Sequence, residues 1–238
     1  MKTLRRLIAA RCGAPVKTAI RNLLDEVKAA RLSRHSSRFL RELSGKRELN
    51  IHLGCGGDVK PGWVNIDIIL DGGLPSLPRD SETFFFNYDI RLGLPLAAES
   101  CDMIYSSHFF EHLYYKQGVQ LMRDCYKVLR RGGVFRVCLP NFKRAFEAYV
   151  NQDQEYFELI DISNVLPEVE KGTETIVDYI NYVVYQSGEH KCVYDEEKIM
   201  RLLEDTGFGQ VTTSSFKADI DVDSKVRRHF SFYVEAVK

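Results

Sequence analysis

Short strand-like segments that alternate with helical ones constrain the fold of this chain most strongly. Runs of strand length occur at residues 49–54, 63–68, 83–90, 101–107 and 133–140. The connections after the first runs are short, and a segment with helical spacing separates the last two. Strands that alternate with helices in this way predict a doubly wound α/β fold on a mostly parallel sheet.

The remaining segments extend this pattern. Between residues 107 and 133 the apolar residues recur with a helical period, and the "RRGG" that follows them is typical of a helix end. Residues 141–190 are rich in Tyr, Phe, Glu and Asp and lack strand alternation, which indicates an insertion of helices and loops. A helix over 195–208 and two strands over 210–216 and 229–238 are predicted to close the chain.

Charge divides the 238-residue chain into two parts. Residues 1–47 hold 13 Lys and Arg against three acids, which gives them a net charge of +10. Because the formal net charge of the whole chain is zero, residues 48–238 carry −10. We therefore expect a basic helical extension over 1–47 and one domain over 48–238 that contains the insertion.

The basic extension also has an apolar stripe with helical spacing. Its members are Val16, Ile20, Leu23, Leu24 and Val27. One interpretation is that the stripe packs on the domain and leaves a solvated basic face. The other is that the helix makes a peripheral contact with an anionic membrane or another polyanion.

Composition disfavours several other classes of protein. The sequence has no run of 18 apolar residues, so no membrane-spanning helix is predicted. Its first residues do not resemble a signal peptide. The six cysteines form no CxxC pair and have no histidine at zinc-ligand spacing. We expect no metal and a cytoplasmic location, with the inner membrane surface as a peripheral alternative.

The residues that end each strand-like run are the candidates for function, because open α/β sheets bind ligands beyond the carboxyl ends of their strands. The first run ends in the glycines of "LGCGG", the second in Asp67, the third in Asp89 and the fourth in Ser106 to His108. Glycines permit a tight turn and a close backbone approach. A carboxylate such as Asp67 can accept hydrogen bonds from both hydroxyls of a ribose. The short spacing from glycines to Asp67 and the missing third glycine disfavour a dinucleotide site.

Four stretches in this order resemble class I S-adenosylmethionine-dependent methyltransferases, in a small bacterial-type branch associated with cell-surface glycans or lipids. They read "LNIHLGCGGDVKPGWVNIDI", "NYDIRLGLPLAAESCDMIYSSHFFEHL", "VLRRGGVFRVCLPN" and "GEHKCVYDEEKIMRLLEDTGF". The resemblance covers about residues 48–210 and implies a Rossmann-like, mostly parallel seven-stranded sheet with an antiparallel last strand. It implies S-adenosylmethionine as the cofactor. The chain departs from many relatives at His52, where they carry an acid.

The resemblance also assigns roles by position. The residues that would bind the cofactor are Gly54, Cys55, Gly56, Gly57, Asp67, Ile68, Asp89, Ile90, Ser106 and His108. Among them, Asp67 would bind the ribose hydroxyls, and Asp89 with the backbone of Ile90 would lie beside the adenine. The candidates for catalysis are His108, Glu111, His112 and His190. Each also has a plain structural interpretation, as a turn, early-helix or loop residue.

The expected reaction is methyl transfer to a small molecule, a sugar or a lipid-linked glycan, at oxygen. A hydroxyl acceptor must lose a proton, and histidine suits that role near neutral pH, so His108 is the first candidate base. A nicotinamide-dependent oxidoreductase, a non-catalytic scaffold and a nucleic-acid methyltransferase with residues 1–47 as its arm are alternatives. The charge of −10 on the domain disfavours nucleic acid.

Overall fold

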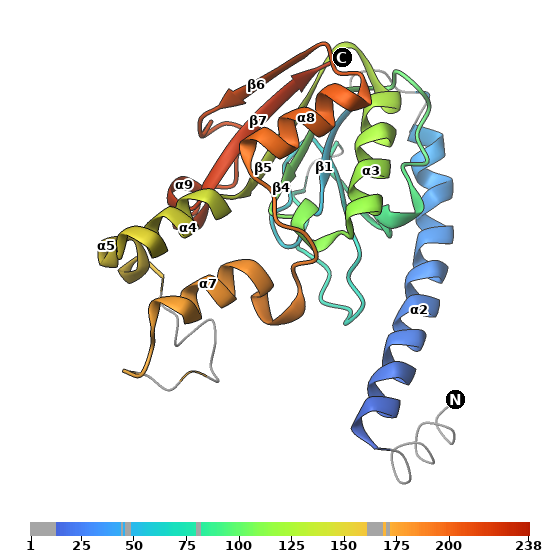
Figure 1. Ribbon diagram of the computed structural model, residues 1–238. Coiled ribbons are helices and arrows are strands. Elements are labelled where there is room, and N and C mark those ends of the chain that lie inside the picture. The colour runs from blue at the N-terminus through green and yellow to red at the C-terminus, as the bar shows by residue number, and fades with distance from the viewer. Residues whose placement is uncertain (1–12, 44, 46–48, 80–81, 161–168, 170–171) are drawn as a thin grey trace.

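A mixed sheet of seven strands carries the fold in the computed structural model, which describes residues 13–43, 45, 49–79, 82–160, 169 and 172–238 (Figure 1). The strands are β1 (Leu49–Leu53), β2 (Val64–Asp67), β3 (Phe84–Asn87), β4 (Cys101–Ser107), β5 (Leu129–Pro140), β6 (Gln210–Ser214) and β7 (Ser231–Val237). Their order is β3-β2-β1-β4-β5-β7-β6. Strands β1 to β5 pair in parallel, and β7 is antiparallel to both of its neighbours. The predicted α/β fold with an antiparallel last strand is confirmed.

Helices cover the sheet and extend beyond it (Figure 1). They are α2 (Ala14–Leu43), α3 (Tyr115–Val128), α4 (Phe142–Asn151), α5 (Gln154–Glu158), α7 (Ile176–Tyr185), α8 (Glu196–Thr206) and α9 (Lys225–His229), with 3-10 turns η1 (Ile90–Leu92), η2 (Phe110–His112) and η3 (Gln186–Gly188). Helices α3 and α8 pack side by side, whereas α4 and α7 pack against each other in an arm away from the sheet. Within the described residues, the predicted insertion is therefore helical, as expected.

The boundaries of α8 follow from its sequence. Asp195 caps the helix by accepting a hydrogen bond from the Lys198 N–H at 2.8 Å, and two glutamates lie in the first turn. Gly207 ends the helix in the left-handed conformation with φ of 116°. These are the signals on which the sequence prediction depended.

The "RRGG" run does not end a helix as predicted. Helix α3 ends at Val128, and the run lies at the beginning of β5. A Cβ on Gly133 would lie 3.1 Å from the backbone oxygen of Asp102 on the neighbouring strand. The glycine therefore permits a close approach between β4 and β5.

The buried residues of α2 all lie in its second half. They are Ala29, Ser33, Ser36, Leu40 and Leu43. The Ser36 hydroxyl donates to the backbone oxygen of Asn87 at 2.9 Å, and the Ser33 hydroxyl accepts from the Asp89 N–H at 2.8 Å. These two hydrogen bonds hold α2 against the carboxyl end of β3.

The apolar stripe of α2 is covered only in part. Ile20 and Leu24 are half-buried, whereas Val16, Leu23 and Val27 are 47%, 63% and 42% exposed. The first half of the helix projects away from the sheet (Figure 1). The predicted boundary after residue 47 lies outside the described residues and stays a prediction. None of the described helices is long and apolar enough to cross a membrane.

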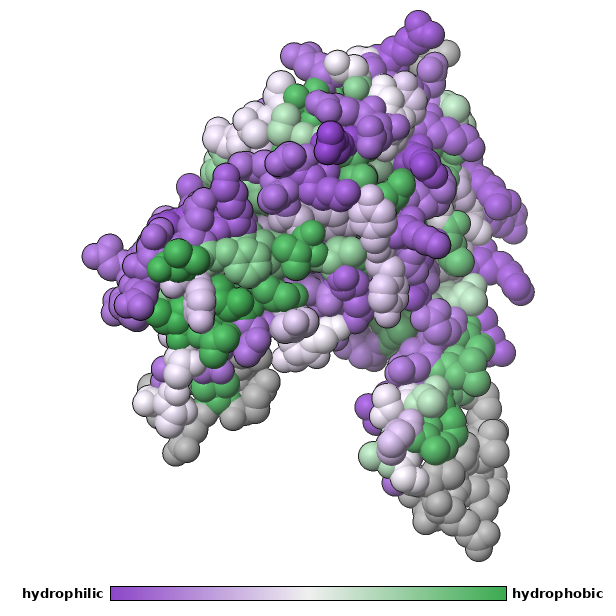
Figure 2. All heavy atoms as spheres, viewed as in Figure 1, coloured by the Kyte–Doolittle hydropathy of each residue, from purple (hydrophilic) through white to green (hydrophobic). Residues whose placement is uncertain are grey.

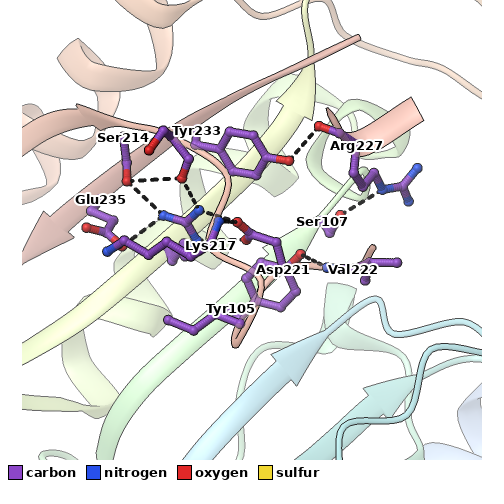
Figure 3. Close-up of polar contacts among 12 residues, drawn as sticks. Tyr105, Ser107, Ser214, Lys217, Asp221, Val222, Arg227, Tyr233 and Glu235 are labelled. Carbon is purple, nitrogen blue, oxygen red and sulfur yellow. Dashed lines mark hydrogen bonds and ion pairs between the residues drawn. The ribbon is translucent and has the colours of Figure 1, made fainter. Parts of the chain in front are cut away.

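A buried arginine of β5 forms ion pairs with Asp221, in the segment before α9, and with Glu235 on β7 (Figure 3). Arg136 on β5 is fully buried and forms an ion pair with Asp221 and a second one with Glu235 at 2.8 Å. Its guanidinium also donates to the backbone oxygen of Ser215 at 2.8 Å. Next to Asp221, the Val222 N–H donates to the Tyr105 hydroxyl at 3.2 Å. The network therefore fixes the segment that leads into α9.

Replacing Arg136 by Met should destabilise the fold by about 3–5 kcal/mol, because the buried Asp221 carboxylate would lose its partner. Urea unfolding followed by circular dichroism measures the change. Arg38→Met is the control, since Arg38 pairs with Glu42 at an 82% exposed position and its loss should shift the midpoint far less. Equal midpoints for the two variants would contradict this account.

Candidate active site

A cavity of about 450 Å³ lies at the carboxyl ends of β1, β2 and β4. We call it the loop cavity; its lining residues are His52, Gly54, Cys55, Gly56, Asp58, Asp67, Ile68, Ser107, His108, Phe109, His112, Glu189, Val222 and Arg227. Larger clefts, of about 510 and 700 Å³, lie beside α4 and along α2, but none of the predicted cofactor-binding or catalytic residues lines them. The loop cavity is therefore the candidate site.

The glycine loop forms one wall of this cavity. Gly54 and Gly56 have φ of +64° and +52°, which glycine adopts without strain. A Cβ on Gly54 would lie 2.3 Å from the Phe109 ring, whereas Gly56 faces open space. The Asp67 carboxylate accepts hydrogen bonds from the N–H groups of Gly56 and Ile68, both at 2.6 Å. Asp67 thus holds the loop, and further lone pairs of its carboxylate can accept from a ligand.

Two of the residues that line the loop cavity, His52 and Arg227, are basic residue types that differ in charge. His52 is buried and its ring lies 4.9 Å from that of Tyr105. Burial, and then the charge of Lys60, lower the pKa of His52 to about 3, so the ring is neutral. Arg227 donates from Nε to the Ser107 hydroxyl at 3.0 Å. The cavity wall is thus neutral at His52, and Arg227 adds a positive charge to it.

His108 is held in a strained conformation, with φ of +48°. Its Nε2 lies 2.7 Å from the hydroxyl of Ser231, which donates in turn to the Val226 oxygen at 3.2 Å. Because that hydroxyl has one proton, Nε2 of His108 is the donor and Nδ1 carries the free lone pair. Burial, and then the charge of Arg227, hold the pKa of His108 well below its ordinary value of 6.5.

Glu111 lies behind His108 and is fully buried. Its Oε1 is 3.9 Å from His108 Nδ1, beyond hydrogen-bonding distance. Neither carboxylate oxygen has a hydrogen-bond partner among the described residues. Burial raises the pKa of Glu111 to about 8, and the charge of Arg227 offsets this effect only in part.

His112 and His190 meet beside Glu111, with ring centroids 4.9 Å apart. The backbone N–H groups of Lys191 and Cys192 donate to the backbone oxygen of Glu111 at 2.7 and 3.1 Å. These two hydrogen bonds hold the end of the insertion on η2. Burial lowers the pKa of both histidines. The structure therefore brings all four candidate catalytic residues together.

A second, smaller cavity of about 180 Å³ lies on the other side of His108. We call it the insertion cavity; its lining residues are His108, Asn141, Tyr156, Leu159, Ile160, Tyr182, Val183, Gln186, His190, Lys225, Val226 and Phe230. His108 lines both cavities, whereas His112 lines only the loop cavity and His190 only the insertion cavity.

Some residues proposed for cofactor binding lie elsewhere. Asp89 is buried and its carboxylate accepts from the Arg91 guanidinium at 2.7–3.1 Å, so it stabilises η1 and does not line the loop cavity. Ile90 is in the hydrophobic core. The Ser106 side chain is buried, and the next residue, Ser107, lines the cavity instead, because side chains alternate along a strand. Gly57 is exposed and does not line it either.

Sequence reasoning missed other residues of the cavity. Asp58 directly follows the glycine loop, so its position was the available signal. Arg227 and Val222 come from the segment between the last two strands, which has no motif. They reach the cavity through contacts with β4 that no local pattern encodes.

Comparison with known proteins shows a similarity to one family. Residues 79–137, from before β3 to within β5, match the family model described as a methyltransferase domain. This part of the chain is therefore similar to a methyltransferase domain. No curated protein matches the chain.

Several solved structures are similar to this chain. A S-adenosylmethionine-dependent methyltransferase of Archaeoglobus fulgidus is 19% identical, with 90% of this chain and 94% of that chain covered and a TM-score of 0.49. One from Thermotoga maritima is 14% identical, with coverages of 94% and 95% and a TM-score of 0.46. Phosphoethanolamine N-methyltransferase 2 of Haemonchus contortus, in complex with S-adenosyl-L-methionine, is 11% identical, with coverages of 81% and 49% and a TM-score of 0.48.

The loop cavity has the features that S-adenosylmethionine requires. The open face of Gly56 allows a ligand to approach the backbone, and the Asp67 carboxylate can accept from ribose hydroxyls. Phe109, whose ring packs against Gly54, and His108 also line the cavity. These residues would hold the cofactor.

Asp67→Ala should weaken binding of S-adenosylhomocysteine at least tenfold, because the ribose loses its acceptor and Gly56 loses the bond that fixes the loop. Calorimetric titration of the full chain measures the affinity, with a micromolar dissociation constant expected for the wild type. Asp71→Ala, at an exposed turn, is the matched control and should bind like the wild type. The assignment fails if the two variants have the same affinity.

Proposed function

We propose that the methyltransferase transfers a methyl group to a hydroxyl oxygen of an acceptor that binds in the insertion cavity. The observation that carries this proposal is the position of His108, which lines both cavities. A cofactor in the loop cavity and an acceptor in the insertion cavity would meet at this side chain.

When bound, S-adenosylmethionine supplies an electrophilic methyl group; the methyl–sulfur bond breaks with its electron pair left on sulfur, and an oxygen–methyl bond forms. The acceptor hydroxyl must lose its proton in this exchange. Nδ1 of His108 has the free lone pair to accept it, because Nε2 is engaged with Ser231. The walls formed by Phe109 and α9 exclude water and align the acceptor oxygen.

The lining of the insertion cavity supports an acceptor with apolar ring faces and a few polar groups. Tyr156 and Phe230 provide aromatic surface, with ring centroids 5.1 Å apart. Asn141, Gln186 and Lys225 provide hydrogen-bonding groups at its edge. A sugar, free or as the head of a lipid-linked glycan, has this combination of CH faces and hydroxyls.

The projecting half of α2 supports a membrane-bound source for this acceptor. Apolar atoms gather on that end of the helix (Figure 2), where Leu23 is 63% exposed. Exposed basic residues of the same helix, Lys17, Arg21, Lys28 and Arg31 among them, flank the stripe. Anionic lipid binds such a combination of apolar and basic side chains, whereas nucleic acid needs only the charge. We therefore propose a peripheral contact with an anionic membrane.

His108→Gln should lower the rate of methyl transfer by about 10²–10⁴-fold, because glutamine cannot accept the proton. Affinity for S-adenosylhomocysteine should stay within threefold. The assay follows labelled methyl transferred from S-adenosylmethionine to a panel of glycosides and lipid-linked sugars. His229→Gln, an exposed residue outside both cavities, is the control. Wild-type cofactor binding without transfer to any acceptor would favour the non-catalytic alternative.

Leu23→Glu should reduce binding to phosphatidylserine vesicles by tenfold or more in a sedimentation assay, because it places a charge in the exposed stripe. Leu74→Glu is the control, since Leu74 is 57% exposed outside the helix. Binding to RNA instead of vesicles, abolished by salt and insensitive to Leu23→Glu, would support the nucleic-acid alternative and refute the membrane contact.

A further inference from the structure

Three metal-ligating side chains converge between the two cavities. They are Glu111 and His112 of η2 and His190 from the end of the insertion. One carboxylate oxygen and one nitrogen of each ring lie within 4.8 Å of one another. Sequence spacing gave no sign of this cluster, because His190 comes from a segment far along the chain.

Glu111 is a buried acid whose carboxylate has no hydrogen-bond partner in the described structure. It is 0% exposed, and neither of its oxygens accepts a hydrogen bond from a described residue. Burying an unpaired carboxylate is costly, and buried carboxylates are usually paired or bound to a metal. A cation between Glu111 and the two histidines would remove this penalty.

His190 has the orientation of a metal ligand. Its Nδ1 lies 2.8 Å from the backbone oxygen of Val183, so in the neutral ring Nδ1 is the donor and Nε2 keeps a free lone pair. Metal-binding histidines almost always donate their other N–H to a carbonyl or carboxylate in this way. The backbone hydrogen bonds from Lys191 and Cys192 to Glu111 hold His190 against η2.

We propose that Glu111, His112 and His190 bind one divalent transition-metal ion of the zinc class. Two imidazoles and one carboxylate suit such an ion, whereas Mg²⁺ and Ca²⁺ prefer oxygen ligands throughout. Ligand atoms at zinc lie roughly 3–3.5 Å apart, so the three groups would draw together by about 1–2 Å on binding. This proposal replaces the expectation, based on cysteine spacing, that the chain binds no metal.

The role of this ion in methyl transfer rests on the proposed function. His112 lines the loop cavity and His190 the insertion cavity, so the ion would lie at the junction where the acceptor oxygen is expected. A metal ion that coordinates a hydroxyl favours loss of its proton. The proton would pass to His108, and the metal would keep its charge and oxidation state.

The test uses the full chain after treatment with a chelator. Zn²⁺ titration by calorimetry should show one site per chain, and Co²⁺ should give visible absorption bands typical of bound nitrogen and oxygen ligands. Glu111→Gln and His190→Ala should each weaken Zn²⁺ binding tenfold or more and remove the Co²⁺ bands. His35→Ala, an exposed histidine on α2, is the matched control and should bind like the wild type.

A wild-type chain that binds neither ion stoichiometrically would overturn the proposal, as would unchanged binding in both Glu111→Gln and His190→Ala. Circular dichroism shows whether each variant is folded, and the wild-type titration needs no variant. S-adenosylhomocysteine binding is measured on the same metal-free samples. If the cofactor product binds and Zn²⁺ does not, the metal site is refuted while the proposed function stands; if neither binds, both fail.

Discussion

The parallel pairing of β1, β4 and β5 is the constraint on which the rest of this structure depends. Leu53 pairs with Ser106, and Ser107 pairs with Cys138, so the three strands end at one edge of the sheet. The loops that follow them then start side by side and carry Gly54, His108 and Asn141. Backbone pairing therefore determines that a glycine cradle, a histidine and the insertion meet at one place.

Two long-range attachments complete the site at that edge. The end of the insertion is held on η2 by hydrogen bonds to the Glu111 carbonyl, which brings His190 to His112. The segment before α9 is held by the buried Arg136–Asp221 ion pair, which brings Val222 and Arg227 to the cavity. Both attachments close the site with residues distant in sequence.

The sequence predicted those parts of the site that depend on local signals. The glycine loop and Asp67 lie at strand ends that short apolar runs mark clearly, and the structure places them in one cavity. The surroundings of Asp89 were not predictable in the same way, because its carboxylate pairs with Arg91 and its backbone N–H donates to Ser33 of α2. The stripe of α2 shows the same limit: helical spacing predicts an amphipathic face, but only contacts in space show that Leu23 is uncovered.

The central claim is that His108 separates a cofactor cavity from an acceptor cavity. A crystal structure of the full chain with S-adenosylhomocysteine tests it most directly. The account predicts the ribose hydroxyls on the Asp67 carboxylate and the sulfur directed toward His108, with the insertion cavity open beyond it. Density for the ligand in the cleft along α2, or a sulfur directed away from His108, would contradict the account.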